Sequence, residues 1–379
     1  MASRLNIQGE DALKKVLDYF SKEDSFEKEV YENLKKEILS LAREKELKNL
    51  SKLVFAMIKP AAFARGLAPE IIEWLHHKGF RIALAKLKDL RGKELDELYV
   101  FVKRKYHESW WIMERAYSMA PALAMVLVGD SNGFEHASAR LRSLIGPTTP
   151  EAGKQGNLRY DLKGVNRVFN IIHISDDPAA ALRESSVFFD KKEVLESLNS
   201  DNEAEIGMLE LGPSNVIRLS RWDIFSRLKA RCNSILGSNE LQELLDIESK
   251  IVSKGLSFDE ERSELFPIEI KISELAHSLK EKAKEEAIDK ARSNLSLKDK
   301  KIWDTIDDKL LAAQCIELLS DELLLIEEQN FDLVLLWMID RGVIVDEWEE
   351  IITHSTWAVM PQMIKDLKKY RKIVISRRG

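Results

Sequence analysis

The stretch 168-VFNIIHISDD-177 decides the fold, because it predicts a buried strand that ends directly before a helix. Its β-branched and apolar residues are typical of a strand inside a sheet. The strand ends at His173, and the Ser, Asp and Pro residues that follow indicate a strand stop and a helix start. Glu184 lies eleven residues after His173, within that helix, so its carboxylate can fold back to the imidazole.

A histidine at the edge of a sheet is a candidate nucleophile when a second group orients its ring. His173 and Glu184 fit that pattern. The alternative is an ordinary packed histidine, which is the more common case for a single histidine at the end of a strand. The choice between the two interpretations depends on the residues that precede the strand.

Several groups that can bind phosphate precede His173 in the chain. Lys59 ends the apolar stretch LVFAMIK, Arg142 and Thr148 lie six residues apart on either side of a Gly-Pro pair, and Arg159 follows a Gly-rich loop. Guanidiniums match phosphate oxygens bidentately and stay charged, so two of them with a hydroxyl predict a polyphosphate site. Taken singly, each of these residues is an ordinary surface residue. The long loop before Arg159, interrupted by Gly and Pro, favours the functional interpretation.

The sequence contains neither the GxxxxGK[ST] loop of P-loop proteins nor the GxGxxG loop of protein kinases. The phosphates are therefore not expected to lie in a nest of backbone N–H groups.

The ordered series Lys59-Pro60, RSLIGPT, NLRYDL, Asn170 and His173 resembles the nucleoside diphosphate kinases over roughly residues 53–190. In that family a histidine takes the γ-phosphate of a nucleoside triphosphate and passes it to a nucleoside diphosphate. The resemblance therefore implies a phosphotransferase that works by double displacement through a phosphohistidine.

The resemblance also implies a role for each matched residue. His173 is the nucleophile, Glu184 accepts the hydrogen bond of its other ring nitrogen, and Ser175 completes the pattern. The residues implied to bind the nucleotide are Lys59, which reaches the phosphates and the ribose hydroxyl, together with Arg142, Thr148, Arg159 and Asn170. Mg²⁺ is expected to arrive bound to the nucleotide, so no metal site built from protein ligands is implied.

The role of Asn170, which is to hold the ribose hydroxyl, rests on the resemblance alone. Asn170 stands three residues before His173. In a regular strand this spacing puts the two side chains on opposite faces, unless the strand bends or ends between them.

The family carries paired aromatic residues, one of which stacks on the base. This chain has Trp110 and Trp111 at the matching place, with two or three extra residues between them and Tyr99. Either indole can stack on a base, because every base offers a π-face. The alternative is that the two tryptophans fill a contact between helices.

Three departures from the family pattern affect the surroundings of the site. Ile174 replaces the usual glycine after the histidine, one residue is added between Arg159 and Asn170, and 119-MAP-121 replaces Ser-Gly-Pro. The β-branched side chain of Ile174 can crowd the approach to the histidine or exclude a backbone angle that glycine allows. We expect crowding, and the alternative is a pocket rebuilt around the isoleucine. The departures favour a second hypothesis, in which the chain is a nucleotide-binding regulatory module with weak or no transfer activity and its helical part binds a partner.

The expected fold class is α+β, with a ferredoxin-like antiparallel sheet of four strands covered by helices and a largely α-helical C-terminal domain. The strands are expected at 53–59, 80–90 and 121–129 and in the stretch that ends at His173.

The expected domains are a helical hairpin at 1–50, the kinase-like domain at 51–190, a linker at 191–215 and a helical domain of unknown function at 216–379. Within the linker, a short strand is expected at 206–211. Apolar helices such as 331–340 are expected to be buried. We expect the helical extensions to replace or remodel the assembly surface, which predicts a homo-oligomer.

The composition is typical of an intracellular globular protein. The 379 residues are 45% hydrophobic and carry a net charge of −6, so neither nucleic acid nor a membrane is an expected partner. Cys232 and Cys315 stand far apart in the sequence and resemble thiols of a reducing compartment. No signal peptide is recognised, and the most apolar run, 333–339, is too short to span a bilayer. We therefore expect a cytoplasmic protein.

Overall fold

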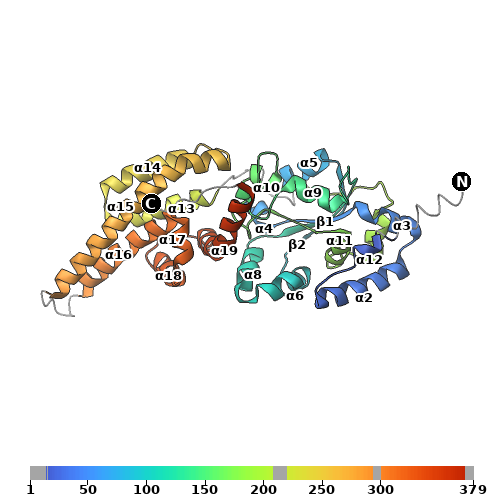
Figure 1. The fold of residues 1–379 in the computed structure, drawn as a ribbon, viewed down its shortest axis with the longest axis horizontal. Coiled ribbons are helices and arrows are strands. Elements are labelled where there is room, and N and C mark those ends of the chain that lie inside the picture. Colours follow the sequence, from blue (N-terminus) through green and yellow to red (C-terminus); the bar gives the residue numbers. More distant parts are fainter. Residues whose placement is uncertain (1–13, 15, 208–219, 293–299, 372–379) are drawn as a thin grey trace. The chain divides into compact units, whose positions relative to one another are not determined.

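The computed structural model describes residue 14 and residues 16–207, 220–292 and 300–371 (Figure 1). Two compact units can be separated by their internal contacts. The first unit comprises Met1–Pro147, Gly156–Leu162 and Phe169–Ile217, and the second comprises Thr148–Gln155, Lys163–Val168 and Arg218–Gly379. The chain thus passes from one unit to the other four times between Pro147 and Phe169.

The first unit contains one antiparallel sheet of four strands in the order β2-β3-β1-β4. The strands are β1 (Leu53–Ile58), β2 (Phe80–Lys88), β3 (Ala122–Gly129) and β4 (Ile172–Ile174). This sheet, together with the helices that cover it and the helical remainder of the chain, confirms the predicted α+β fold class.

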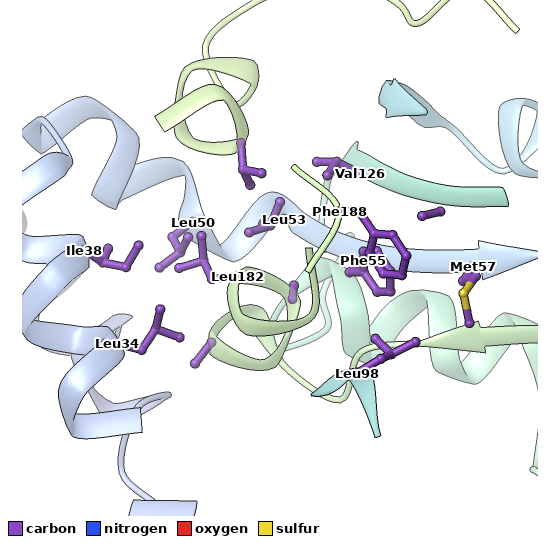
Figure 2. Close-up of a cluster of buried hydrophobic side chains, with 14 of the residues drawn as sticks. Leu34, Ile38, Leu50, Leu53, Phe55, Met57, Leu98, Val126, Leu182 and Phe188 are labelled. Carbon is purple, nitrogen blue, oxygen red and sulfur yellow. The ribbon is translucent and has the colours of Figure 1, made fainter. Parts of the chain in front are cut away.

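Strand β1 lies inside the sheet because every one of its side chains is apolar and buried. Leu53, Phe55 and Met57 pack into the core on one face of the sheet, which Figure 2 shows from close by. The alternate residues, such as Val54 and Ile58, pack into a second core on the other face. A strand without a polar face must be covered on both sides, and here helices cover both.

The helices of the first unit follow the apolar periodicity of the sequence. They are α2 (Ser25–Leu41), α3 (Glu44–Asn49), α4 (Pro60–Ala64), α5 (Ala68–His77), α6 (Gly92–Leu98), α7 (Val100–Lys105), α8 (Trp110–Ser118), α9 (Ala137–Ile145), α10 (Leu158–Asp161), α11 (Pro178–Ser185) and α12 (Lys191–Ser197). Leu34 and Ile38 of α2 and Leu182 of α11 belong to the core around Phe55 (Figure 2). Ile71 of α5 belongs to the opposite core.

The strand that carries His173 is shorter than the sequence predicts. Strand β4 contains only Ile172–Ile174, and the preceding residue Ile171 has a φ of +68°. A β-branched residue rarely adopts this left-handed conformation, so the surroundings must hold it there. Phe169 and Ile171 are buried in a bend rather than in the sheet. Apolar composition alone cannot distinguish these two kinds of buried segment.

The stretch 191–215 also differs from a simple linker at its start. Helix α12 begins after Asp190, whose carboxylate accepts hydrogen bonds from the backbone N–H groups of Lys192 and Glu193. Val194 and Leu195 of this helix belong to the core of the first unit. Of the strand expected at 206–211, residues 206 and 207 have no regular structure and the others lie outside the described residues.

The C-terminal part of the second unit, residues 220–292 and 300–371, is mainly helical. Its helices are α13 (Arg221–Leu236), α14 (Asn239–Val252), α15 (Phe258–Arg292), α16 (Lys300–Ser320), α17 (Glu322–Glu327), α18 (Phe331–Asp340) and α19 (Glu347–Arg371). Helix α18 is less buried than its composition predicts, because Leu333 and Leu336 are 66% and 61% exposed. No helix within the described ranges combines the length and the apolarity needed to cross a membrane.

Candidate active site around His173

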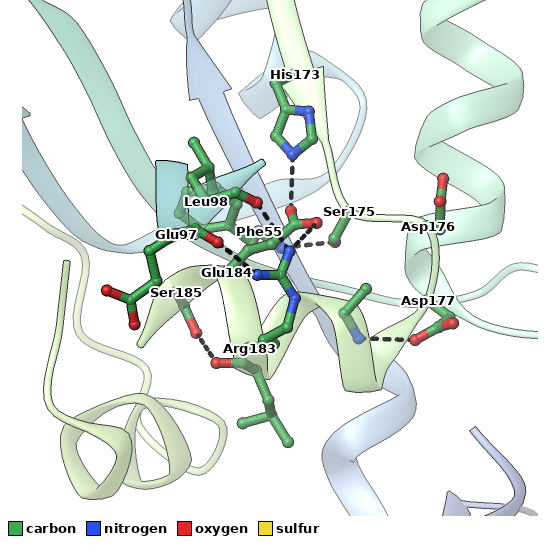
Figure 3. A network of polar contacts seen from close by, with 12 residues as sticks. Phe55, Glu97, Leu98, His173, Ser175, Asp176, Asp177, Arg183, Glu184 and Ser185 are labelled. Carbon is green, nitrogen blue, oxygen red and sulfur yellow. Dashed lines mark hydrogen bonds and ion pairs between the residues drawn. The ribbon is translucent and has the colours of Figure 1, made fainter. Parts of the chain in front are cut away.

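His173 is held at the edge of the sheet by a carboxylate from helix α11. Its Nε2 atom lies 2.7 Å from Oε2 of Glu184, and Figure 3 shows the ring pointing at that carboxylate. Helix α11 begins directly after the strand because Asp177 caps its N-terminus and Pro178 occupies its first turn. A carboxylate oxygen accepts hydrogen bonds, so Nε2 carries the ring proton and Nδ1 keeps a lone pair. This is the tautomer that a nucleophilic histidine needs.

The carboxylate of Glu184 is itself fixed by Arg183, a residue that the sequence analysis did not identify. Arg183 Nη2 lies 3.3 Å from Oε1 of Glu184, and the same guanidinium donates to the carbonyl oxygens of Glu97 and Leu98, each at 2.9 Å (Figure 3). The series of contacts from His173 through Glu184 to Arg183 thus ends on two backbone carbonyls. Residues that orient a catalytic group in this way act through it rather than on the substrate.

Two aromatic rings pack against the imidazole of His173. The ring of Tyr99 lies edge-on at 5.1 Å between centroids, and that of Phe55 lies at 6.1 Å. The hydroxyl of Tyr99 is 2.7 Å from that of Tyr117. Burial raises the pKa of both tyrosines, so they stay neutral at physiological pH. These contacts restrict the imidazole to one orientation.

Lys59 and Asn170 meet just before the start of strand β4. The ammonium of Lys59 donates to Oδ1 of Asn170 at 3.2 Å and lies 5.8 Å from the ring of Tyr117. Its backbone N–H donates to the carbonyl of Ile171 at 2.9 Å. Because of the left-handed bend at Ile171, Asn170 does not belong to the strand that carries His173. The alternation of side chains along a strand therefore does not force Asn170 and His173 onto opposite faces.

The ammonium of Lys59 is held in a setting that disfavours its charge. The residue is only 6% exposed. Burial, and to a lesser extent the positive charge of Arg159, lower the pKa of Lys59 to about 7. An anionic phosphate placed beside it would offset both effects.

The two arginines differ in how they are held. Arg159 of α10 donates from Nη1 to the carbonyl of Gly146 at 3.1 Å and from Nη2 to that of Ile172 at 2.6 Å. Its guanidinium is thus tied to the backbone next to His173. Arg142 of α9 is exposed and forms an ion pair with Asp176, which a phosphate can replace without opening the core.

Thr148 is the one predicted phosphate ligand that lies in the second unit, where it is exposed. Its neighbour Thr149 is fully buried and donates its hydroxyl to Asp366. The pattern GPTT alone gave no way to tell which threonine is buried.

The two tryptophans have different environments. Trp110 is 4% exposed, belongs to the core and donates its indole N–H to Asp96 at 3.0 Å. It therefore packs in a contact between helices, as the alternative interpretation expected. Trp111 is 38% exposed and is the better candidate for contact with a base.

Ile174 and Ser175, the two residues that follow His173, are both buried. Ser175 is fully buried, and its hydroxyl accepts a hydrogen bond from the backbone N–H of Phe55 at 3.1 Å. This bond ties the end of β4 to β1. Ile174 is 6% exposed and packs into the core with Ala56 and Ile58, on the side of the strand opposite His173. The expectation that its side chain crowds the histidine is therefore wrong.

The site contains cationic and neutral donors rather than a metal-binding cluster. Among the residues that the structure describes, no group of three or more His, Cys, Asp or Glu side chains is arranged to hold a metal ion. Lys59 and Arg159 match the oxygens of a polyphosphate instead.

Comparison with known proteins identifies the family. The family profile described as "Nucleoside diphosphate kinase" matches residues 53–194. The nucleoside diphosphate kinase of Persephonella marina is 36% identical over 143 residues, which are 37% of this chain and 94% of that protein. That of Metallosphaera sedula is 34% identical, with 38% and 96% covered. A crystal structure of the enzyme from Encephalitozoon cuniculi is 32% identical and covers 36% of this chain and 88% of its own, with a TM-score of 0.33. The chain therefore belongs to the nucleoside diphosphate kinase family through its residues 53–194.

Proposed function

We propose that this chain transfers the γ-phosphate of a nucleoside triphosphate to a nucleoside diphosphate through a phosphorylated His173. The observation that carries the proposal is the 2.7 Å contact between His173 Nε2 and Glu184 Oε2. It leaves Nδ1 as the ring nitrogen with a lone pair, on a strand end next to Lys59 and Arg159. The substrates are nucleoside di- and triphosphates with Mg²⁺ bound to their phosphates.

In the first half of the reaction, Nδ1 of His173 attacks the γ-phosphorus of the triphosphate. The N–P bond forms while the bond from phosphorus to the β,γ-bridging oxygen breaks, and the electron pair leaves with the nucleoside diphosphate. The imidazole becomes positively charged, and Glu184 stabilises that charge through the Nε2 proton, which stays in place. In the second half, a terminal oxygen of another diphosphate attacks the same phosphorus and the electron pair returns to Nδ1.

The remaining residues position the nucleotide and stabilise its charge. Lys59, Arg142, Arg159 and Thr148 are proposed to bind the phosphates, and Asn170 the ribose hydroxyl. Trp111 is proposed to stack on the base, since a stacking contact tolerates any base. In this scheme the protein contributes orientation and electrostatic stabilisation, which are the main needs of phosphoryl transfer.

We further propose that the protein is cytoplasmic and forms a homo-oligomer, as its family and its helical extensions suggest. Light scattering on the full chain tests the second point. A strictly monomeric mass at all concentrations would contradict it.

A second candidate function is nucleotide binding with weak or no transfer, with the helical unit as a regulatory arm. The observation that favours it is the second unit itself, most of which lies outside the matched residues 53–194. The two functions differ in one measurable quantity, which is the rate of phosphate exchange between ATP and another diphosphate.

Brief incubation with γ-labelled ATP tests the leading proposal. We expect an acid-labile label on the protein and exchange between ATP and a second diphosphate, with both absent in His173→Ala. His77→Ala is the matched control, because His77 is exposed and lies outside the site. A label that survives in His173→Ala would exclude this nucleophile. Tight nucleotide binding without any label would favour the regulatory function.

A further inference from the structure

Two segments of the kinase-family region belong to the helical second unit. They are Thr148–Gln155 and Lys163–Val168, and both lie inside the matched residues 53–194. Between them, Gly156–Leu162 returns to the first unit and carries Arg159. The chain enters the first unit again at Phe169, one residue before Asn170.

The first segment is fixed by a buried cluster of charges. Glu151 is 5% exposed and accepts hydrogen bonds from Nε of Arg262 at 2.9 Å and from Nη2 of Arg221 at 3.3 Å. Both arginines also bind Glu322 at the start of α17. Two guanidiniums and two carboxylates balance one another, so each charge is compensated although the cluster is buried. The cluster fixes the short turn Pro150–Ala152 against the helices of its own unit.

The second segment is fixed by three hydrogen bonds, which come from two of its residues. Lys163 forms a buried ion pair with Glu261 at 2.9 Å. The side-chain amide of Asn166 donates to the hydroxyls of Ser355 and Thr356, each at 3.0 Å. A positive φ of 48° at Lys163 makes this segment a specific bend rather than an extended connection.

One carboxylate joins the two segments. Asp366 of helix α19 accepts from the hydroxyl of Thr149 in the first segment and from the guanidinium of Arg167 in the second. Arg167 also donates to the hydroxyl of Thr149 at 3.3 Å. Gln362, one turn earlier on α19, donates to the other oxygen of Asp366 at 3.1 Å. Asp366 is 14% exposed, so its charge is partly removed from water and depends on these donors.

We propose that the helical unit is a positioning device for the nucleotide site, with Asp366 as the positioning residue that both segments share. The inference rests on the proposed function of the His173 site. Thr148 opens the first segment, Arg159 lies between the two, and Asn170 follows the second by two residues. Fixing the segments restricts the backbone at each of these residues, which reduces the ordering that nucleotide binding must impose.

This arrangement predicts an effect on nucleotide binding that a general loss of stability does not produce. Asp366→Asn removes the negative charge that accepts hydrogen bonds from Arg167 and Thr149. Both segments therefore lose the carboxylate that joins them. We expect the Kd for ADP and the KM for the diphosphate to rise about tenfold, with a smaller change in kcat. We also expect faster amide hydrogen exchange in residues 148–155 and 163–168.

Glu349→Gln is the matched control. Glu349 is also an acidic residue of α19, is 1% exposed and accepts from Arg231 at 2.6 and 3.1 Å. The described contacts of its carboxylate lie with α13 and with Val345, outside both segments. We expect Glu349→Gln to lower the midpoint of thermal unfolding without changing the Kd for ADP or the exchange in the two segments.

Asp366→Glu and Asn166→Ala keep the experiment interpretable if Asp366→Asn fails to fold. Asp366→Glu retains the charge and should restore part of the affinity. Asn166→Ala removes only neutral hydrogen bonds and should accelerate exchange in 163–168. The inference is overturned if Asp366→Asn and Glu349→Gln change the exchange of the two segments equally, or if folded Asp366→Asn binds ADP as the wild type does. Absence of label on His173 in the wild type would instead overturn the proposed function, because the exchange measurement needs no activity.

Discussion

His173 and Glu184 meet at 2.7 Å although they belong to different elements, a strand edge and the helix that follows it. The contact exists because the helix begins immediately after the strand and runs back along it, with Asp177 as its cap. Arg183 then holds the second carboxylate oxygen. A ring that is fixed at one nitrogen presents the other nitrogen in one direction, which is what attack on phosphorus requires.

Replacing Glu184 by glutamine should slow transfer without weakening nucleotide binding. The amide keeps the shape of the side chain but no longer stabilises the charged imidazole, so we expect a fall in kcat of about 10- to 100-fold. Glu196→Gln on the exposed side of α12 serves as the control. Stopped-flow measurement of histidine phosphorylation and calorimetry with ADP separate the two effects. An unchanged rate of phosphorylation would mean that Glu184 does not act on the nucleophile.

Lys59 should make nucleotide binding depend on pH. Its pKa in the folded protein, about 7, lies below its ordinary value of 10.5. The free energy of unfolding should therefore rise with pH between these two values, because the unfolded chain binds the additional proton there. Bound phosphate favours the charged ammonium, so ADP binding at pH 8 should take up about one proton. Calorimetry in buffers of different ionisation enthalpy measures this uptake.

Lys59→Met supplies the control for that measurement. We expect the proton uptake at pH 8 to disappear and the pH dependence of stability between 7 and 10.5 to flatten. Proton uptake of equal size in the variant would assign it to another group.

Ile174→Gly should lower stability and leave the transfer rate no higher than in the wild type. The side chain packs in the core on the face opposite His173, so its removal leaves a cavity rather than clearing the site. We expect a loss of about 2–5 kcal/mol in the free energy of unfolding, as for other large-to-small core changes, and only about 0.5–1.5 kcal/mol for Ile174→Val. Denaturant unfolding and exchange kinetics on both variants check this. A faster folded Ile174→Gly would restore the crowding hypothesis.

The sequence predicted the elements that depend on local patterns. The four strands, most of the helices and the partnership of His173 with Glu184 follow from apolar runs, caps and helical spacing. It did not predict the bend at Ile171, because a left-handed β-branched residue is held by its surroundings and has no local signature. Nor did it indicate Arg183 or Asp366, each of which has partners 85 or more residues away in the sequence. Long-range polar contacts leave no periodic pattern in a sequence.

Trp111→Ala should weaken nucleotide binding, whereas Trp110→Ala should destabilise the fold. Loss of a stacking contact with a base costs about 1–3 kcal/mol, and loss of a large buried aromatic costs about 3–5 kcal/mol of unfolding free energy. Removal of the Trp110 indole also deprives Asp96 of the N–H group that donates to it at 3.0 Å. Calorimetry with ADP and thermal unfolding distinguish the two variants. Equal ADP affinity in wild type and Trp111→Ala would place the base elsewhere.

Alanine substitutions of Arg142 and Arg159 should differ in their effect on stability, although both residues are proposed phosphate ligands. Arg142 is exposed and paired only with the exposed Asp176 among its described contacts, so Arg142→Ala should weaken ADP binding by about 1.5–3 kcal/mol, the value of a charged hydrogen bond, with little change in stability. Arg159 also holds the carbonyls of Gly146 and Ile172. Arg159→Ala should therefore weaken binding by a similar amount and also lower the unfolding midpoint, because two backbone carbonyls lose their donor. If the Arg159→Ala variant binds ADP normally, the guanidinium of Arg159 serves only to hold the backbone, and phosphate binding depends on Lys59 and Arg142.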